Sequence, residues 1–258
     1  MLRFLLIMVL FFFHSVSYGK KYVLAETPNG LCLKQWLGRD SVIDFNCDTK
    51  LKNIVIIGEM AFEMNKNIKK VILPTKLKVI EKRAFNTCEN LETIIMPQSV
   101  TLIGNSAFNM DRQLSLSSLP NSLVEIGEWA FWDCNKVSIS VIPQSVVKIG
   151  RQAFTCCEGI TTLIFKNNME IINDRSFSGC KNIERITFPK NLRVISHFAF
   201  ARCTKLKSVD FPKSLEKIGY RAFADCWDLE SANFSSAPNV DSTAFVNCKY
   251  HFEYQSKQ

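Results

Sequence analysis

The residues of this sequence best suited to chemistry are its ten cysteines, because a thiol can bind zinc, form a disulfide or act as a nucleophile. Seven of them recur at a regular spacing, each three residues after a phenylalanine. These are Cys88, Cys134, Cys157, Cys180, Cys203, Cys226 and Cys248. A zinc ion needs four ligands arranged around one point. Cysteines that recur at one position of a repeat would instead lie in a line when the repeats stack. We therefore predict a column of buried free thiols and no metal site, since parallel Cβ directions also disfavour disulfides between neighbouring rungs.

The other three cysteines do not follow this spacing. Cys32 and Cys47 precede the first repeat, in the segment LCLKQWLGRDSVIDFNC. A solenoid needs a cap over its open core, and a disulfide between Cys32 and Cys47 would staple such a cap. Cys156 is out of register, so we expect it to be the exposed thiol.

No catalytic constellation accompanies the cysteines. His197 and His251 are isolated histidines, and the sequence contains no nucleophile elbow, zinc-protease, P-loop or dinucleotide-binding motif. The acidic residues are scattered over loop positions. These features predict a protein that is not an enzyme and uses no cofactor.

A repeat must position these residues. Phenylalanine, preceded by alanine in all but one case, recurs in seven steps of 23 residues and a last step of 22. It stands at Phe62, Phe85, Phe108, Phe131, Phe154, Phe177, Phe200, Phe223 and Phe245. A unit this short cannot bury its own apolar side, so successive copies must stack and each position becomes a column.

Other repeat positions predict the shape of each coil. A strand is expected just before the proline, for example over residues 185–188, and a second short extended piece over residues such as 146–149. Glycine follows the last isoleucine in five repeats, at Gly58, Gly104, Gly127, Gly150 and Gly219. Because glycine adopts positive φ at little cost, we expect a tight turn there.

The segments LESANF and IERITFPKNLRVISHFAFARC carry a resemblance to the leucine-rich repeats of the BspA-like class, also called the Treponema-type repeat, over roughly residues 48–250. Asp111 in place of the cysteine and Lys166 in place of the proline depart from the pattern in single repeats. The resemblance implies a mainly β solenoid, with short strands on a concave face and loops or short extended pieces on the convex side. It also implies a surface or secreted protein that adheres to matrix proteins or host cells.

The termini suggest export. Residues 1–19 resemble a signal peptide, with Arg3, a short apolar run and small residues before Lys20. We expect residues 20–50 to form the N-terminal cap, residues 51–250 the solenoid of about nine units, and residues 251–258 a polar tail. No second apolar stretch has the length of a membrane span, so the mature chain is predicted to be extracellular, either secreted or associated with a cell surface.

The concave face is the predicted binding surface for a protein partner. Residues eight and ten after each phenylalanine should point outward, because strand side chains alternate. The candidates are Lys70, Ile72, Thr93, Ile95, Leu116, Ile139, Val141, Thr162, Ile164 and Arg185. The aliphatic members predict an exposed apolar stripe over the first five coils, which often marks an interaction site.

An alternative site is the basic N-terminal end. The net charge of the whole chain is +8, and residues 20–83 account for +6 of it, from 13 basic and 7 acidic side chains. The cluster comprises Lys66, Lys69, Lys70, Lys76, Lys78, Lys82 and Arg83. It predicts a contact with an anionic glycan or other polyanion that weakens with salt. Nucleic acid is not an expected partner. For glycosylation, the sequence has one N-x-S/T sequon, which begins at Asn233.

Overall fold

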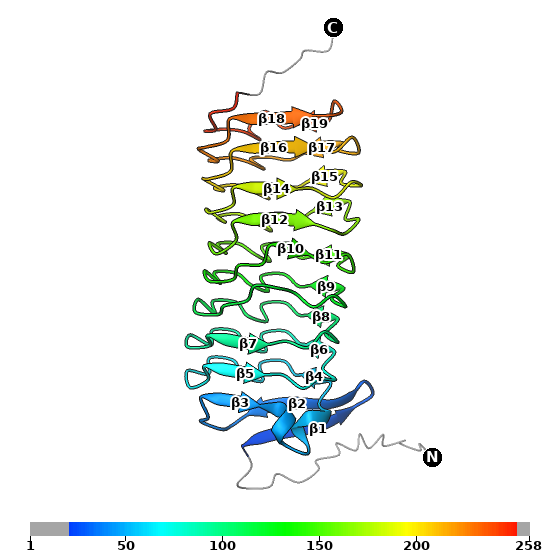
Figure 1. Cartoon of the computed structure of the whole chain (residues 1–258), viewed down its shortest axis with the longest axis vertical. Coiled ribbons are helices and arrows are strands. Elements are labelled where there is room, and N and C mark those ends of the chain that lie inside the picture. The colour runs from blue at the N-terminus through cyan, green and yellow to red at the C-terminus, as the bar shows by residue number, and fades with distance from the viewer. Residues whose placement is uncertain (1–20, 252–258) are drawn as a thin grey trace, which may run out of the picture.

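The computed structural model describes residues 21–251, so the expected signal peptide and residues 252–258 of the tail lie outside the described part. The chain winds into coils of about 23 residues that stack along one axis, with the first and last described coils at opposite ends (Figure 1). One contiguous cluster of buried residues runs from Leu33 to Phe245. The predicted leucine-rich repeat solenoid, mainly β, is confirmed.

Most coils have two short strands on different sides, whereas the coil of Phe108 has only the second one. We call the side with the first strand of each repeat the first strand face. It carries β3 (Val42–Asp44), β5 (Lys70–Ile72), β7 (Thr93–Ile95), β10 (Val141–Ile142), β12 (Thr162–Phe165), β14 (Arg185–Thr187), β16 (Ser208–Phe211) and β18 (Ser231–Phe234). These strands pair in parallel within three separate sheets: β3-β5-β7, β10-β12-β14 and β16-β18.

The second strand face lies on the other side of the coils in Figure 1. It carries β4 (Ile56–Ile57), β6 (Val79–Ile80), β8 (Leu102–Ile103), β9 (Glu125–Ile126), β11 (Lys148–Ile149), β13 (Ile171–Ile172), β15 (Val194–Ile195), β17 (Lys217–Ile218) and β19 (Asn239–Val240). Together with β1 (Tyr22–Thr27) and β2 (Gly30–Trp36), they form a seven-stranded sheet, β1-β2-β4-β6-β8-β9-β11, and a four-stranded sheet, β13-β15-β17-β19.

The N-terminal end extends both faces. Strand β1 (Tyr22–Thr27) pairs antiparallel with β2 (Gly30–Trp36), which in turn pairs in parallel with β4. Two single-turn 3₁₀ helices, η1 (Phe45–Cys47) and η2 (Leu51–Asn53), follow β3. The Trp36 ring stacks on Phe62 with centroids 5.7 Å apart, so an aromatic side chain covers the end of the core. Within residues 21–251, no helix has the length and apolar composition needed to cross a bilayer.

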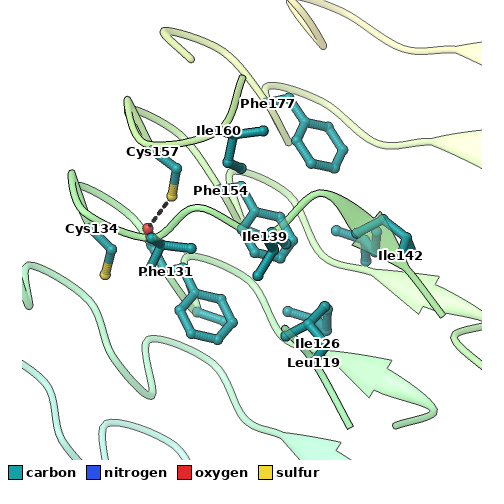
Figure 2. Packing of buried hydrophobic residues seen from close by; sticks show 14 of the residues in the cluster. Leu119, Ile126, Phe131, Cys134, Ile139, Ile142, Phe154, Cys157, Ile160 and Phe177 are labelled. Carbon is teal, nitrogen blue, oxygen red and sulfur yellow. Dashed lines mark hydrogen bonds between the residues drawn. The ribbon is translucent and has the colours of Figure 1, made fainter. Parts of the chain in front are cut away.

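The repeated phenylalanines form one stack through the solenoid. From Phe62 to Phe245, neighbouring ring centroids are 4.8–5.5 Å apart and the ring planes differ by 5–14°. Figure 2 shows three members, Phe131, Phe154 and Phe177, among aliphatic side chains of the core. Aromatic pairs favour such stacking beyond the area they bury, so each ring joins adjacent coils.

The third side of each coil, which we call the turn face, carries the Ala-Phe pair in a run of turns. In the coil of Phe131, the Phe131 N–H donates to the Ala153 carbonyl of the next coil at 2.8 Å. The N–H groups of Trp129 and Asp133 donate to the next coil in the same way. Both residues have positive φ, 52° and 59°, and the same two positions do so in every coil from Phe62 to Phe223.

The left-handed backbone is therefore not at the repeated glycines, which corrects the expectation of a tight turn there. Among the described glycines, only Gly30 and Gly179 have positive φ. Glycine is needed at these positions because it has no side chain. A Cβ on Gly127 would lie 2.5 Å from the Asn105 backbone nitrogen, and one on Gly150 would lie 2.4 Å from that of Glu128. The coils pass too closely there for a side chain on these residues.

Candidate interaction surface

The outward residues of the first strand face were the predicted partner-binding site, and the structure modifies that set. The pattern is as expected in four strands: the middle residue is buried and its neighbours point outward in β5, β7 and β14, and partly exposed and buried residues alternate in β12. Lys70, Ile72, Thr93, Val141, Thr162 and Ile164 are partly exposed, while Ile95 and Arg185 are exposed. Ile95 retains 47% of its accessible surface.

Leu116 and Ile139 do not belong to this surface, which corrects the prediction of a continuous stripe. Leu116 is 7% exposed and Ile139 is fully buried. In their repeats the residue expected to point inward is serine, Ser117 or Ser140, and both serines are exposed. Because burying an unpaired hydroxyl is costly, the backbone turns the preceding aliphatic side chain into the core instead.

The exposed apolar residues consequently form two groups on the first strand face. Ile72 and Ile95 pair across β5 and β7, and Val141 and Ile164 pair across β10 and β12. Exposed Ser118 occupies the equivalent position between the groups. We call these four aliphatic residues the apolar stripe. Beyond them the same column becomes polar, at Thr187, Asp210 and Asn233.

The sequence analysis missed one apolar residue of this face. Val42 on β3 lies beside Lys70 in the parallel register and is 57% exposed. It precedes the first full repeat, so the phenylalanine spacing could not reveal it. The alternation in SVIDF, with buried Ile43 and Phe45, was the available signal.

The predicted basic cluster does not form one patch. Residues 66–83 span one coil, so its cations surround the solenoid axis: Lys70 lies on the first strand face and Lys78 beside the second. Lys82 and Arg83 lie on the turn face, where they pair with Glu59 and Glu63. Lys76 is exposed in the loop between β5 and β6. Lys66, paired with Glu89 at 3.4 Å, and exposed Lys69 lie close to Lys70 in the chain and remain the compact part of the cluster.

The repeat cysteines are structural. All are free; six are buried and Cys248 is half-buried. Each thiol donates to the carbonyl of a phenylalanine in the preceding coil, as Cys157 does to Phe131 at 3.1 Å (Figure 2). Burial raises the pKa of thiols such as Cys157, so they stay protonated. Half-buried Cys156 also has a raised pKa.

Cys32 and Cys47 are both free, which corrects the predicted disulfide. Cys32 is buried on β2 in the sheet of the second strand face, where it pairs with Ile56. Cys47 is exposed at the end of η1, directly after β3 of the first strand face. The two residues lie on different sides of the coil, and the cap is held instead by β-pairing and by Trp36.

The two isolated histidines both lie at the surface. His197 Nδ1 accepts the Tyr220 N–H at 3.0 Å, and His251 is exposed. In the described part of the chain, no group of three histidine, cysteine or acidic residues has an arrangement that could hold a metal. The exposed Asn233 amide donates to Asp210 at 2.7 Å.

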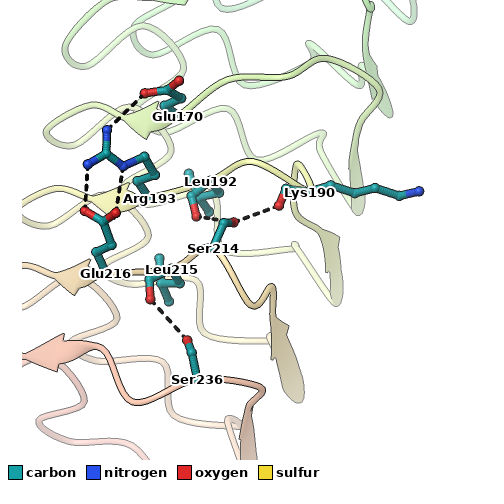
Figure 3. Close-up of polar contacts among 8 residues, drawn as sticks. All are labelled: Glu170, Lys190, Leu192, Arg193, Ser214, Leu215, Glu216 and Ser236. Atoms are coloured by element: carbon teal, nitrogen blue, oxygen red, sulfur yellow. Dashed lines mark hydrogen bonds and ion pairs between the residues drawn. The ribbon is translucent and has the colours of Figure 1, made fainter.

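The second strand face is joined by its own side chains. Arg193 lies between Glu170 and Glu216, with closest separations of 3.5 and 2.8 Å, and Ser214 donates to two carbonyls of the preceding coil (Figure 3). Val124 and Val147 are nevertheless exposed on this side. Because they are exposed aliphatic residues on a different face, they are suitable control positions for substitutions in the apolar stripe.

Known structures share this architecture. A leucine-rich repeat protein of Bacteroides ovatus is 27% identical, with a TM-score of 0.70, over 89% of this chain and 68% of that one. A leucine-rich repeat protein of T. pallidum is 25% identical, with a TM-score of 0.66, over 74% of this chain and 90% of that one. No curated protein matches the chain. The family model described as the BspA type leucine rich repeat region matches residues 45–141 and 136–251. The chain therefore belongs to the BspA-type leucine-rich repeat family.

Proposed function

We propose that this protein is exported and binds a protein partner outside the cell, in adhesion to host matrix or to cells. Family membership supports a protein-interaction role, and the segment at residues 1–19 supports export. The observation that carries the proposal is the apolar stripe, whose four aliphatic residues reach solvent from two sheets of the first strand face. Exposed apolar groups of this kind favour association because binding removes them from water.

The stripe can be extended by neighbouring side chains. Val42 and the aliphatic stem of Lys70 lie at its N-terminal end, while Thr93 and Thr162 lie beside the isoleucines. Arg185 ends it with a charge. Exposed Ser117 and Ser118 lie between its two apolar groups, so the surface combines apolar and polar contacts, as protein interfaces do.

Binding of residues 20–258 to immobilised matrix proteins and to epithelial cells tests this proposal. An Ile95→Lys/Ile164→Lys variant should lose binding at least tenfold, and binding of the unchanged protein should persist at high salt. The matched control is Val124→Lys/Val147→Lys, which adds the same charge on the second strand face and should bind normally. Loss in the control alone would move the interface to the second strand face.

The second candidate function is polyanion binding at the N-terminal end. The observation in its favour is the run of Lys66, Lys69 and Lys70 on one side of the first full coil. A Lys69→Glu/Lys70→Glu variant should then lose binding to heparin, with steep dependence on ionic strength. Heparin binding that survives this variant would exclude the N-terminal lysines as its site.

A further inference from the structure

The turn face carries a row of arginine and aromatic side chains near the C-terminal end of the solenoid. Arg175, Phe198 and Arg221 occupy the same repeat position in three successive coils, two residues before the stacked phenylalanine. All three have positive φ, between 50° and 56°. The backbone N–H groups of Arg175 and Phe198 donate to the following coil at 3.0 Å, so the row stands on a rigid base.

The aromatic rings hold the two guanidinium groups. The Arg175 Cζ lies 4.3 Å from the centroid of the Phe198 ring. Phe198 packs edge-on against Tyr220 at 5.3 Å, and the Arg221 Cζ lies 5.5 Å from the Tyr220 centroid. A guanidinium stacked on a ring keeps its N–H groups available at the edge, in a fork that matches an oxyanion.

These two arginines differ from their neighbours in having no carboxylate partner. Among the ion pairs of residues 21–251, Arg151 pairs with Asp174 and Arg202 with Asp225, but neither Arg175 nor Arg221 takes part. Asp241, the next carboxylate along, accepts from Thr243. Two positioned cations thus face solvent without neutralisation, unlike Arg83 or Arg193.

The spacing of the two cations indicates what they would bind. One coil separates them, so they stand about 10 Å apart along the solenoid axis, twice the spacing of adjacent strands. The row is straight and parallel to the axis because it follows the stack. A ligand with oxyanions repeated along a linear chain would meet both guanidiniums at once, and each fork could take two oxygens of one sulfate.

We propose that Arg175 and Arg221 form a binding site for a sulfated linear glycan that lies along the turn face. Its sulfates pair with the two guanidiniums, and its hydroxyl groups meet the exposed polar edge of Tyr220. This site is separate from the apolar stripe and from the N-terminal lysines. It does not depend on the proposed protein partner.

Heparin affinity of the full mature chain, residues 20–258, tests the site at fixed ionic strength. An Arg175→Gln/Arg221→Gln variant should bind heparin at least tenfold more weakly. The matched control, Arg193→Gln/Lys217→Gln, removes the same charge from the second strand face and should stay within twofold. Equal loss in both variants would overturn the site, because it would mean that only net charge matters.

A conservative variant distinguishes the contribution of the planar guanidinium geometry from that of the positive charge. Arg175→Lys/Arg221→Lys keeps both cations but removes the planar groups, and we expect at least a threefold loss. Affinity unchanged from the natural sequence would contradict a site built on stacked guanidiniums. Poly-glutamate is the competing probe: tighter binding to it than to heparin, lost in the glutamine variant, would overturn the glycan in favour of an acidic peptide. The Ile95→Lys/Ile164→Lys variant should bind heparin normally. Loss of the protein interface can therefore be distinguished from loss of the heparin site.

Discussion

The two strand faces of the solenoid differ in their strand pairing within the same two coils. On the second strand face, β9 and β11 continue the ladder from β8 through the coils of Phe108 and Phe131. On the first strand face those coils interrupt the ladder. Between β7 and β10 only one isolated bridge remains, from Thr93 to Ser115.

The difference follows from one inward position. The second face keeps a buried isoleucine in both coils, Ile126 and Ile149. The first face has serine where the neighbouring coils bury Ile94 and Leu163. A strand needs an apolar side chain at its inward position to stay in register, whereas the coil stack does not need every strand. The phenylalanine column and the turn ladder run unbroken past the gap, so the solenoid remains continuous.

The largest expected effect comes from breaking the shared column. Phe131→Ala should lower the free energy of unfolding by about 3–5 kcal/mol, because it removes a fully buried ring from between two others. Urea unfolding measures this. Val147→Ala, at a largely exposed residue of the second strand face, should stay within about 0.5 kcal/mol. Similar losses in both variants would show that the column does not support the interrupted coils.

The next effect concerns Asp111, which replaces the repeat cysteine in the coil of Phe108. It is fully buried; its Oδ1 accepts the Cys88 N–H at 2.7 Å, and its Oδ2 has no partner. Burial raises the pKa of the Asp111 carboxyl well above its usual range. The folded chain therefore holds a proton that the unfolded chain loses near pH 4, so stability falls as pH rises from there toward the folded pKa.

Asp111→Cys should restore the thiol of the other coils and remove this dependence. At pH 7 we expect a gain of about 1–3 kcal/mol, shrinking toward pH 4. The comparison is urea unfolding of both proteins across that range. A difference that does not change with pH would mean that the carboxyl does not titrate between the two states.

A smaller effect should follow from repairing the first face. Leu116→Thr/Ser117→Val places the aliphatic side chain at the inward position and should rebuild a strand beside β7. Amide hydrogen exchange over residues 115–118 should slow about fivefold, as expected for about 1 kcal/mol of local stability. Ser118→Val alone changes an outward residue and should leave exchange there unchanged. Equal slowing in both variants would mean that β-propensity, not the direction of the side chain, breaks the ladder.

The smallest effect concerns the turn face, which is intact in both regions. Thr87 is β-branched and has φ of 59°, a conformation that such residues rarely adopt. Thr87→Asn should raise the free energy of unfolding by about 0.5–1 kcal/mol, because asparagine tolerates this region. Thr161→Asn, where φ is not positive, should give no gain. A loss of stability at Thr87 would show that its side-chain packing outweighs the backbone cost.

Much of this protein follows from its sequence. The spacing of the phenylalanines determines the coil length, and the columns of Phe131, Cys134 and their equivalents follow because stacked copies must bury the same positions. Buried free thiols and two short strands in most repeats could also be predicted, since both depend only on that period.

The tertiary structure alone decided which side chains reach solvent. Leu116 and Ile139 occupy outward positions by count, yet the backbone rotates them inward because Ser117 and Ser140 cannot fill the core. Gly127 and Gly150 serve the close approach of neighbouring coils, a contact between residues about 23 apart in the chain. Lys70 and Lys78 are close in sequence but separate around one coil, and Cys32 and Cys47 end on different sides for the same reason. The repeat period sets position along the axis, while direction around it depends on the backbone path that packing selects.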